Sequence, residues 1–135
     1  MNPKVLIVDD EVPILSGIKL NLGRTFDLTL ANGGEEALKA VEEEGPFEVV
    51  VSDMRMPGMS GVELLARIKS EHPTTQTILL TGHADFEFGG SQALQSGQIF
   101  RILSKPCPPP KLREAIEAGI RAKKRKEAES QSSDS

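Results

Sequence analysis

Short apolar runs of strand length alternate along this chain with longer segments of helical periodicity. Residues 5–8 are all aliphatic, as expected for a strand covered on both faces, and residues 12–22 repeat their apolar positions at helical spacing. This alternation predicts a doubly wound α/β fold, with helices on both faces of a five-stranded parallel sheet. The other predicted elements are strands at 26–31, 47–51, 77–81 and 99–103 and helices over 35–44, 62–70 and 111–125.

The fourth helix has the weakest sequence signal. It is expected somewhere within residues 84–95, but Gly89 and Gly90 stand in the middle of that segment. Each glycine costs about 1 kcal/mol relative to alanine in a helix interior. We therefore expect this helix to be short, broken or mobile.

Length and composition predict one domain without stabilising cross-links. A chain of 135 residues can bury a core unaided, and its single cysteine, Cys107, cannot form an internal disulfide. We therefore expect a reducing, cytoplasmic setting. No apolar run near the start is long enough for a membrane span or a signal peptide. The net charge of −4 argues against direct nucleic-acid binding, because phosphate contacts need a basic face.

The last residues differ in character from the rest. We expect a domain over residues 1–121, followed over 122–135 by a charged helix end and a disordered polar tail that includes residues 130–135. The simplest interpretation of the basic cluster is a solvated helix end that complements its own dipole. A linker helix toward an output domain, or a docking stripe for a partner, remains an alternative. The basic residues are Arg121, Lys123, Lys124, Arg125 and Lys126.

Chemically distinctive side chains stand where four of the predicted strands end. Asp9 and Asp10 follow the first strand, Asp53 follows the third, Thr81 ends the fourth and Lys105 follows the fifth. The carboxyl ends of parallel strands meet at one edge of the sheet, where ligands of open α/β folds bind. An isolated acidic pair after a strand is common turn chemistry. The joint pattern is stronger, and it predicts that these side chains converge on one cleft.

This set of groups suits a phosphoryl site with a hard cation. Neighbouring carboxylates repel unless a cation compensates, and clustered oxygens without soft ligands suit Mg²⁺. Lys105 adds a positive charge, and Thr81 adds a hydroxyl that can donate a hydrogen bond. The residues thus predict a site that holds a phosphoryl group on one of its own carboxylates.

Four motifs resemble the receiver domain of two-component response regulators. They are VLIVDDE at 5–11, VSDMRMPGMSG at 51–61, LTGH at 80–83 and LSKP at 103–106. The resemblance runs from residue 4 to about residue 121. It implies a flavodoxin-like fold with strand order 2-1-3-4-5, a signalling switch rather than an enzyme with a separate substrate, and phosphorylation by a sensor histidine kinase.

The resemblance also implies a role for each motif residue. Asp53 would accept the phosphoryl group and would bind Mg²⁺ directly, together with Asp10 and the main-chain carbonyl of Arg55, while Asp9 would act through a metal-bound water. Lys105, with a cis bond to Pro106, would pair with the phosphoryl oxygens. Thr81 would supply the switch hydroxyl, Gly82 would leave room for the phosphoryl donor, and Ser104 would lie beside the cofactor. His83 would border the phosphoryl group together with Arg55, or it is an exposed loop residue without a role.

In the same family, phosphorylation changes the surface formed by the fourth helix, the fifth strand and the last helix. That surface would contact an output domain, an effector protein or a second copy of the chain. One position departs from the pattern, because Ile102 stands where receivers usually have Tyr or Phe. We expect either a weakened aromatic rotation or a substitute role for Phe100, which period-two alternation would place on the same strand face as Ile102.

Three other interpretations fit parts of the pattern. A Mg²⁺-dependent aspartyl-phosphate phosphatase of the haloacid-dehalogenase type needs a second acid two residues after its nucleophile, where this chain has Arg55. A flavin-binding relative needs a Ser/Thr/Gly-rich loop after the first strand, where Asp9 and Asp10 stand. A receiver-like scaffold that is never phosphorylated usually lacks one acid or the lysine, and this chain has kept all of them.

Overall fold

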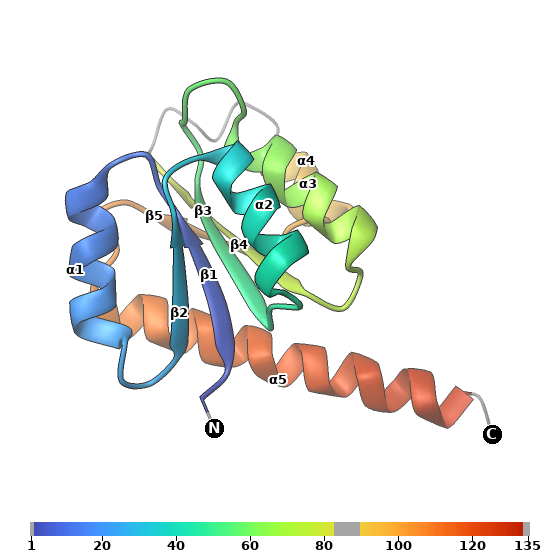
Figure 1. The fold of residues 1–135 in the computed structure, drawn as a ribbon. Coiled ribbons are helices and arrows are strands. Elements are labelled where there is room, and N and C mark those ends of the chain that lie inside the picture. Colours follow the sequence, from blue (N-terminus) through green and yellow to red (C-terminus); the bar gives the residue numbers. More distant parts are fainter. Residues whose placement is uncertain (1, 83–89, 134–135) are drawn as a thin grey trace.

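The protein folds into one five-stranded parallel sheet with helices on both faces, as the sequence and its resemblance predicted (Figure 1). The computed structural model describes residues 2–82 and 90–133, and the strand order is β2-β1-β3-β4-β5. In chain order the elements are β1 Lys4–Val8, α1 Val12–Leu22, β2 Asp27–Ala31, α2 Gly34–Glu44, β3 Val49–Asp53, α3 Gly61–Glu71, β4 Gln76–Thr81, α4 Gly90–Gln95, β5 Arg101–Ser104 and α5 Pro109–Ser133.

Two apolar layers hold the sheet between its helices. The side chains of β1 alternate between the layers, because Leu6 and Val8 pack with α2 and α3, whereas Val5 and Ile7 pack with α1 and α5. All four are buried. The aliphatic run at the start of the chain is therefore a strand covered on both faces, and its carboxyl end delivers Asp9 to the edge of the sheet.

The third strand starts and ends two residues later than the sequence predicted. The run of strand-forming residues begins at Phe47, but pairing with β1 begins where Val5 lies beside Val49. Phe47 is buried before the strand starts. At the other end β3 includes Asp53, so this carboxylate lies on the last residue of the strand rather than in the loop after it.

The expectation of a short, broken or mobile fourth helix stays a prediction, because the structure describes this segment only from Gly90 onward. α4 has six residues, Gly90–Gln95. The first part of the segment in which we expected this helix, and His83, lie outside the described residues.

The last helix is longer than predicted. It continues to Ser133 instead of ending near Arg125, so residues 130–133 are helical where the sequence predicted a disordered tail. Ile120 is the last buried apolar residue of α5. Beyond it, Lys123 lies 3.9 Å from a carboxylate oxygen of Glu48 and 2.9 Å from one of Glu127, and these ion pairs support the helix past the apolar contact. Figure 1 shows this end of α5 projecting beyond the rest of the protein.

None of the described helices has the length and hydrophobicity needed to span a lipid bilayer.

A lysine on α3 makes the stability of the fold depend on pH in the alkaline range. Lys69 donates to the Thr75 carbonyl, and burial together with the charge of Lys126 lowers the pKa of Lys69 from 10.5 to about 8. The unfolded chain therefore binds more protons at this residue between about pH 8 and 10.5, so its contribution to stability rises as pH increases through that window. Chemical denaturation from pH 7 to 10.5 should show the wild type gaining stability relative to a Lys69→Met variant. Cys107 is present in both proteins, so its titration cancels in the comparison. A difference in stability between the two proteins that does not change with pH would contradict the prediction.

Candidate functional site

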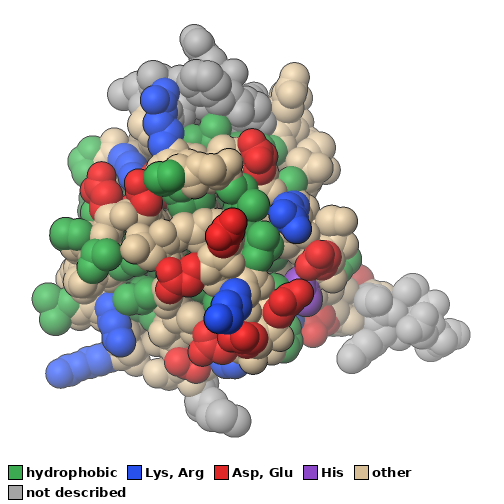
Figure 2. All heavy atoms as spheres, turned by 45° about the horizontal axis from the view of Figure 1, so that its top comes forward, with side chains coloured by type: hydrophobic (Ala, Val, Ile, Leu, Met, Phe, Trp, Pro, Cys, Tyr) green, Lys and Arg blue, Asp and Glu red, His purple; other side chains and the backbone are tan. Residues whose placement is uncertain are grey.

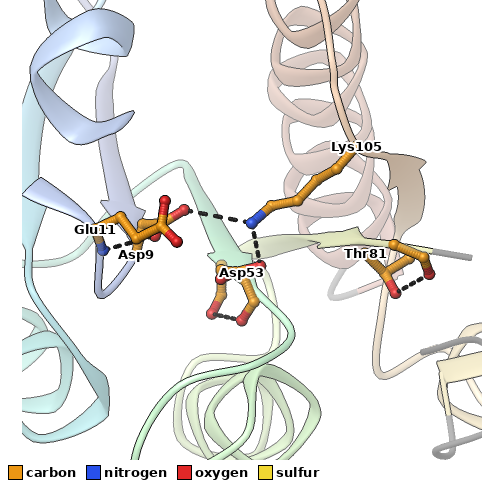
Figure 3. A network of polar contacts seen from close by, with 7 residues as sticks. Asp9, Glu11, Asp53, Thr81 and Lys105 are labelled. Carbon is orange, nitrogen blue, oxygen red and sulfur yellow. Dashed lines mark hydrogen bonds and ion pairs between the residues drawn. The ribbon is translucent and has the colours of Figure 1, made fainter. Parts of the chain in front are cut away.

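The predicted site residues meet at the carboxyl edge of the sheet. Asp9 follows β1, Asp53 ends β3, Thr81 ends β4 and Lys105 follows β5. Since β1 and β3 are neighbours in the sheet, their terminal carboxylates lie side by side, and Lys105 reaches across from β5 (Figure 3). The peptide bond between Lys105 and Pro106 is cis, as the resemblance implied.

Lys105 links the two buried carboxylates. Its Nζ lies 2.7 Å from Oδ1 of Asp53 and 3.8 Å from Oδ2 of Asp9. Burial alone would lower the pKa of Lys105, but the hydrogen bond and charge of Asp53, helped by the charges of Asp9 and Glu11, outweigh it and raise that pKa. The ammonium group is therefore charged at any physiological pH.

One ammonium group does not neutralise the three carboxylates of the site. Asp9, Asp10 and Asp53 each offer an oxygen atom, and these oxygens lie within 4.8 Å of one another. Asp9 and Asp53 are buried, whereas Asp10 is exposed. Burial raises the pKa of Asp9, as do the charges of Asp53 and Asp10, against the opposing effects of the Glu11 main-chain N–H and Lys105.

The cluster fits a hard divalent cation. The Glu11 N–H donates to Oδ1 of Asp9 at 2.9 Å, but Oδ2 of Asp9 is buried without a hydrogen-bond partner in the described part of the chain, since the Lys105 ammonium at 3.8 Å is too far to donate to it. A buried carboxylate oxygen without a donor is costly unless a cation or an ordered water compensates it. The ligand set is all oxygen, which suits Mg²⁺ rather than a soft metal.

A pocket of about 630 Å³ opens beside the cluster. Asp10, exposed Arg55 and Glu63 line it together with Ser60 and apolar residues, so carboxylates and a guanidinium group border the pocket. Its apolar lining includes Met54 and Met56, which the sequence analysis did not assign to the site. Figure 2, which brings this edge of the sheet forward, shows acidic and basic side chains interspersed over the surface.

Thr81 is buried close to the site, but it has not turned toward Asp53. Its hydroxyl donates to the carbonyl of Gly82 at 3.0 Å, as Figure 3 shows. The main-chain N–H of Lys105 donates to the Thr81 carbonyl at 2.9 Å, so the threonine and the lysine are coupled through their backbones. Gly82 is half-buried and Ser104 is exposed.

The first turn of α3 presses against the backbone of Asp53, a contact that the sequence analysis missed. Gly61 donates its N–H to Met54 at 2.8 Å, and a Cβ atom on Gly61 would come within 2.3 Å of the Asp53 carbonyl oxygen. Ser60 accepts a hydrogen bond from the Glu63 N–H and so caps the helix here. The sequence signal that could have indicated this close contact is Gly61 directly after the helix-capping Ser60.

The prediction that Phe100 and Ile102 lie on the same strand face is wrong. Ile102 packs in the layer with α3 and α4, whereas Phe100 packs in the opposite layer with α1 and α5. Period-two alternation holds only within a strand, and β5 begins at Arg101, one residue after Phe100. Phe100 therefore does not replace an aromatic ring at position 102.

A doubly wound parallel sheet with three carboxylates and a lysine at its carboxyl edge defines a class of α/β domains with an acidic site at the switch in strand order. The chain matches the response regulator receiver domain family over residues 5–117. It belongs to this family of two-component signalling switches, whose members bind Mg²⁺ at the acidic pocket and interact with histidine kinases and output domains.

The chain is also similar to individual known proteins. The chain is 35% identical over 119 residues to response regulator protein PilR of Pseudomonas aeruginosa, an alignment that covers 87% of this chain and 26% of PilR. The structure of a response regulator receiver domain protein from Clostridium thermocellum has a TM-score of 0.84 at 35% identity and covers 90% of this chain and 97% of that one. A structure described as adenylate cyclase from Rhodopirellula baltica has a TM-score of 0.91 at 35% identity, with coverages of 97% and 96%.

The chain spans about a quarter of the length of PilR and half the length of the transcriptional regulatory protein PhoP of Bacillus subtilis.

Proposed function

We propose that this receiver domain accepts a phosphoryl group on Asp53 from the phosphohistidine of a sensor histidine kinase. The observation that carries the proposal is the position of Asp53 beside a lysine ammonium group at 2.7 Å and in one cluster with two further carboxylates. Such a site stabilises a phosphoryl group by placing positive charge around its oxygens.

Transfer would exchange one bond to phosphorus for another. A carboxylate oxygen of Asp53 forms the new O–P bond while the P–N bond to the imidazole breaks, and the imidazole leaves with the electron pair. Because the transition state is loose, positioning and charge neutralisation provide most of the catalysis. Asp53 has a side-chain exposure of 9%, and the donor would reach it beside Gly82, which has no side chain to crowd the approach.

Mg²⁺ would be held by Asp10 and Asp53 directly, with the main-chain carbonyl of Arg55, and by Asp9 through a water molecule. When bound, it supplies positive charge to the carboxylates and to the phosphoryl oxygens. Lys105 would shift from the free carboxylate of Asp53 to a phosphoryl oxygen, since the acyl phosphate carries about two negative charges and three acceptor oxygens.

The new charge would act on the rest of the domain through Thr81. Its hydroxyl, which now donates to Gly82, would turn to donate to a phosphoryl oxygen. Movement at the end of β4 would bias the surface formed by α4, β5 and α5, and this surface would contact an output domain, an effector protein or a second copy of the chain.

The direct test is phosphorylation by a small donor. Wild-type protein incubated with Mg²⁺ and acetyl phosphate should gain the mass of one phosphoryl group, and the modification should be removed by hydroxylamine, which cleaves acyl phosphates. The same incubation with EDTA should leave the mass unchanged. An unmodified protein in the presence of Mg²⁺, both with acetyl phosphate and with an active histidine kinase, would favour a receiver-like scaffold that is not phosphorylated.

A further inference from the structure

A second buried threonine lies on β4, at the opposite end of the strand from Thr81. Thr77 is fully buried, and its hydroxyl donates to the main-chain carbonyl of Gln98 at 2.7 Å. Gln98 belongs to the α4–β5 connection, residues 96–100, which joins α4 to β5. One side-chain hydroxyl of the central sheet therefore ties down the segment that follows α4.

Thr77 and Thr81 point to the same face of β4. Side chains alternate along a strand, so Thr77, Leu79 and Thr81 share a face. Leu79 packs in the apolar layer that also contains Ala93 of α4 and Ile99 of the connection. The two hydroxyls thus lie at either end of the face of β4 whose apolar layer includes α3, Ala93 of α4 and Ile99 of the connection.

Among the residues that the structure describes, α4 buries little apolar surface. Of the α4 side chains that the structure describes, Ala93 is buried, whereas Leu94 is 41% exposed. Main-chain bonds add to the attachment, because Ile99 donates to the Ala93 carbonyl at 3.1 Å and Phe100 donates to the Thr77 carbonyl at 2.8 Å. Because the described part of α4 buries so little apolar surface, its local opening costs little, and one buried hydrogen bond is a substantial part of its attachment.

We propose that the Thr77–Gln98 hydrogen bond is a tether that holds the α4–β5 connection in its unmodified arrangement and breaks when modification of Asp53 moves α4. This inference rests on the proposed function. A bond made in one of two states biases the equilibrium toward that state by its net free energy. Removal of the bond should therefore favour the modified state by about two- to tenfold, the range for one neutral intramolecular hydrogen bond.

The chain supplies a matched control for this bond. Thr75, which precedes β4, is also buried, and its hydroxyl donates to a main-chain carbonyl, that of Phe47, at 2.8 Å. Thr75→Val and Thr77→Val make the same chemical change two residues apart, but only the second removes the bond to Gln98. Thr77→Ser retains the hydroxyl and should behave as the wild type.

The first measurement uses the unmodified protein and needs no phosphorylation. Hydrogen exchange at the amides of Ile99 and Phe100 should become about two- to tenfold faster in Thr77→Val than in Thr75→Val, and Thr77→Ser should restore the wild-type rates. Equal exchange at these amides in both valine variants would overturn the tether.

The second measurement tests the coupling to the site. Beryllium fluoride, a non-covalent mimic of a phosphoryl group on a carboxylate, is titrated with Mg²⁺ by calorimetry. Thr77→Val should bind it about two- to tenfold more tightly than the wild type, with Thr75→Val and Thr77→Ser unchanged. Equal binding by Thr77→Val and the wild type, or an equal gain in Thr75→Val, would overturn the tether alone. A wild type that does not bind the mimic would instead overturn the proposed function, and the switching role of Thr77 with it.

Discussion

An Asp53→Asn variant incubated with Mg²⁺ and acetyl phosphate is expected to remain unmodified, a loss of at least about a hundredfold in the rate of phosphorylation. The amide has nearly the shape of the carboxylate but lacks a nucleophilic oxygen. It also removes the negative charge that lies 2.7 Å from the Lys105 ammonium group. Intact-mass spectrometry over the time in which the wild type is fully modified measures the effect.

A control variant distinguishes loss of the Asp53 carboxylate from disturbance of the backbone around it. Ser52 is buried next to Asp53 and donates its hydroxyl to the Asp53 carbonyl, so Ser52→Ala perturbs the same backbone but leaves the carboxylate in place. This variant should still be modified. Asp10 is the exposed acid of the cluster. An unchanged rate of modification in Asp53→Asn would show that Asp10 or another residue is the acceptor.

Asp9→Asn is expected to change the stability of the protein in opposite directions with and without Mg²⁺. The pKa of Asp9 is raised, chiefly by burial, so its ionised form is disfavoured in the folded protein. The folded state then binds more protons at Asp9 than the unfolded state just above pH 3.8, and the charge destabilises the fold at neutral pH. Without metal the variant should therefore melt at a higher temperature than the wild type.

Addition of Mg²⁺ should reverse this order. Loss of a carboxylate that orients a metal-bound water typically weakens metal binding about 10–100-fold, so the variant should gain less stability from millimolar Mg²⁺ than the wild type. Thermal melts at a series of Mg²⁺ concentrations measure both effects. Asp27→Asn, an exposed aspartate at the start of β2, should change neither. A wild type whose melting temperature does not respond to Mg²⁺ would contradict the assignment of the cluster as a metal site.

Much of this architecture could be predicted because its signals are local. The aliphatic run of β1 and the strand-end positions of Asp9, Asp53 and Lys105 are read directly from the order of residues, and the parallel sheet then places the three side chains together. The strand order itself came from the family resemblance, because alternation of strands and helices is compatible with several orders in a sheet.

The features that escaped prediction depend on pairing and packing between distant segments. Phe100 lies in the α1–α5 layer because β5 begins one residue later, and only the register with β4 determines where a strand begins. The extent of α5 depends on Lys123 meeting Glu48, 75 residues earlier in the chain. The contact of Gly61 with the Asp53 backbone likewise requires the approach of α3 to the end of β3.

The length of α5 has a mechanical consequence. The portion beyond Ile120 runs to Ser133, about 20 Å at 1.5 Å per residue, and its side chains described up to residue 129 include no buried apolar one, although Lys123 is buried and pairs with Glu48. A tilt of about 5° where the helix leaves the body would sweep its far end through about 2 Å. The helix is thus a lever that converts angular changes too small to disturb the core into displacements comparable to the size of an atom.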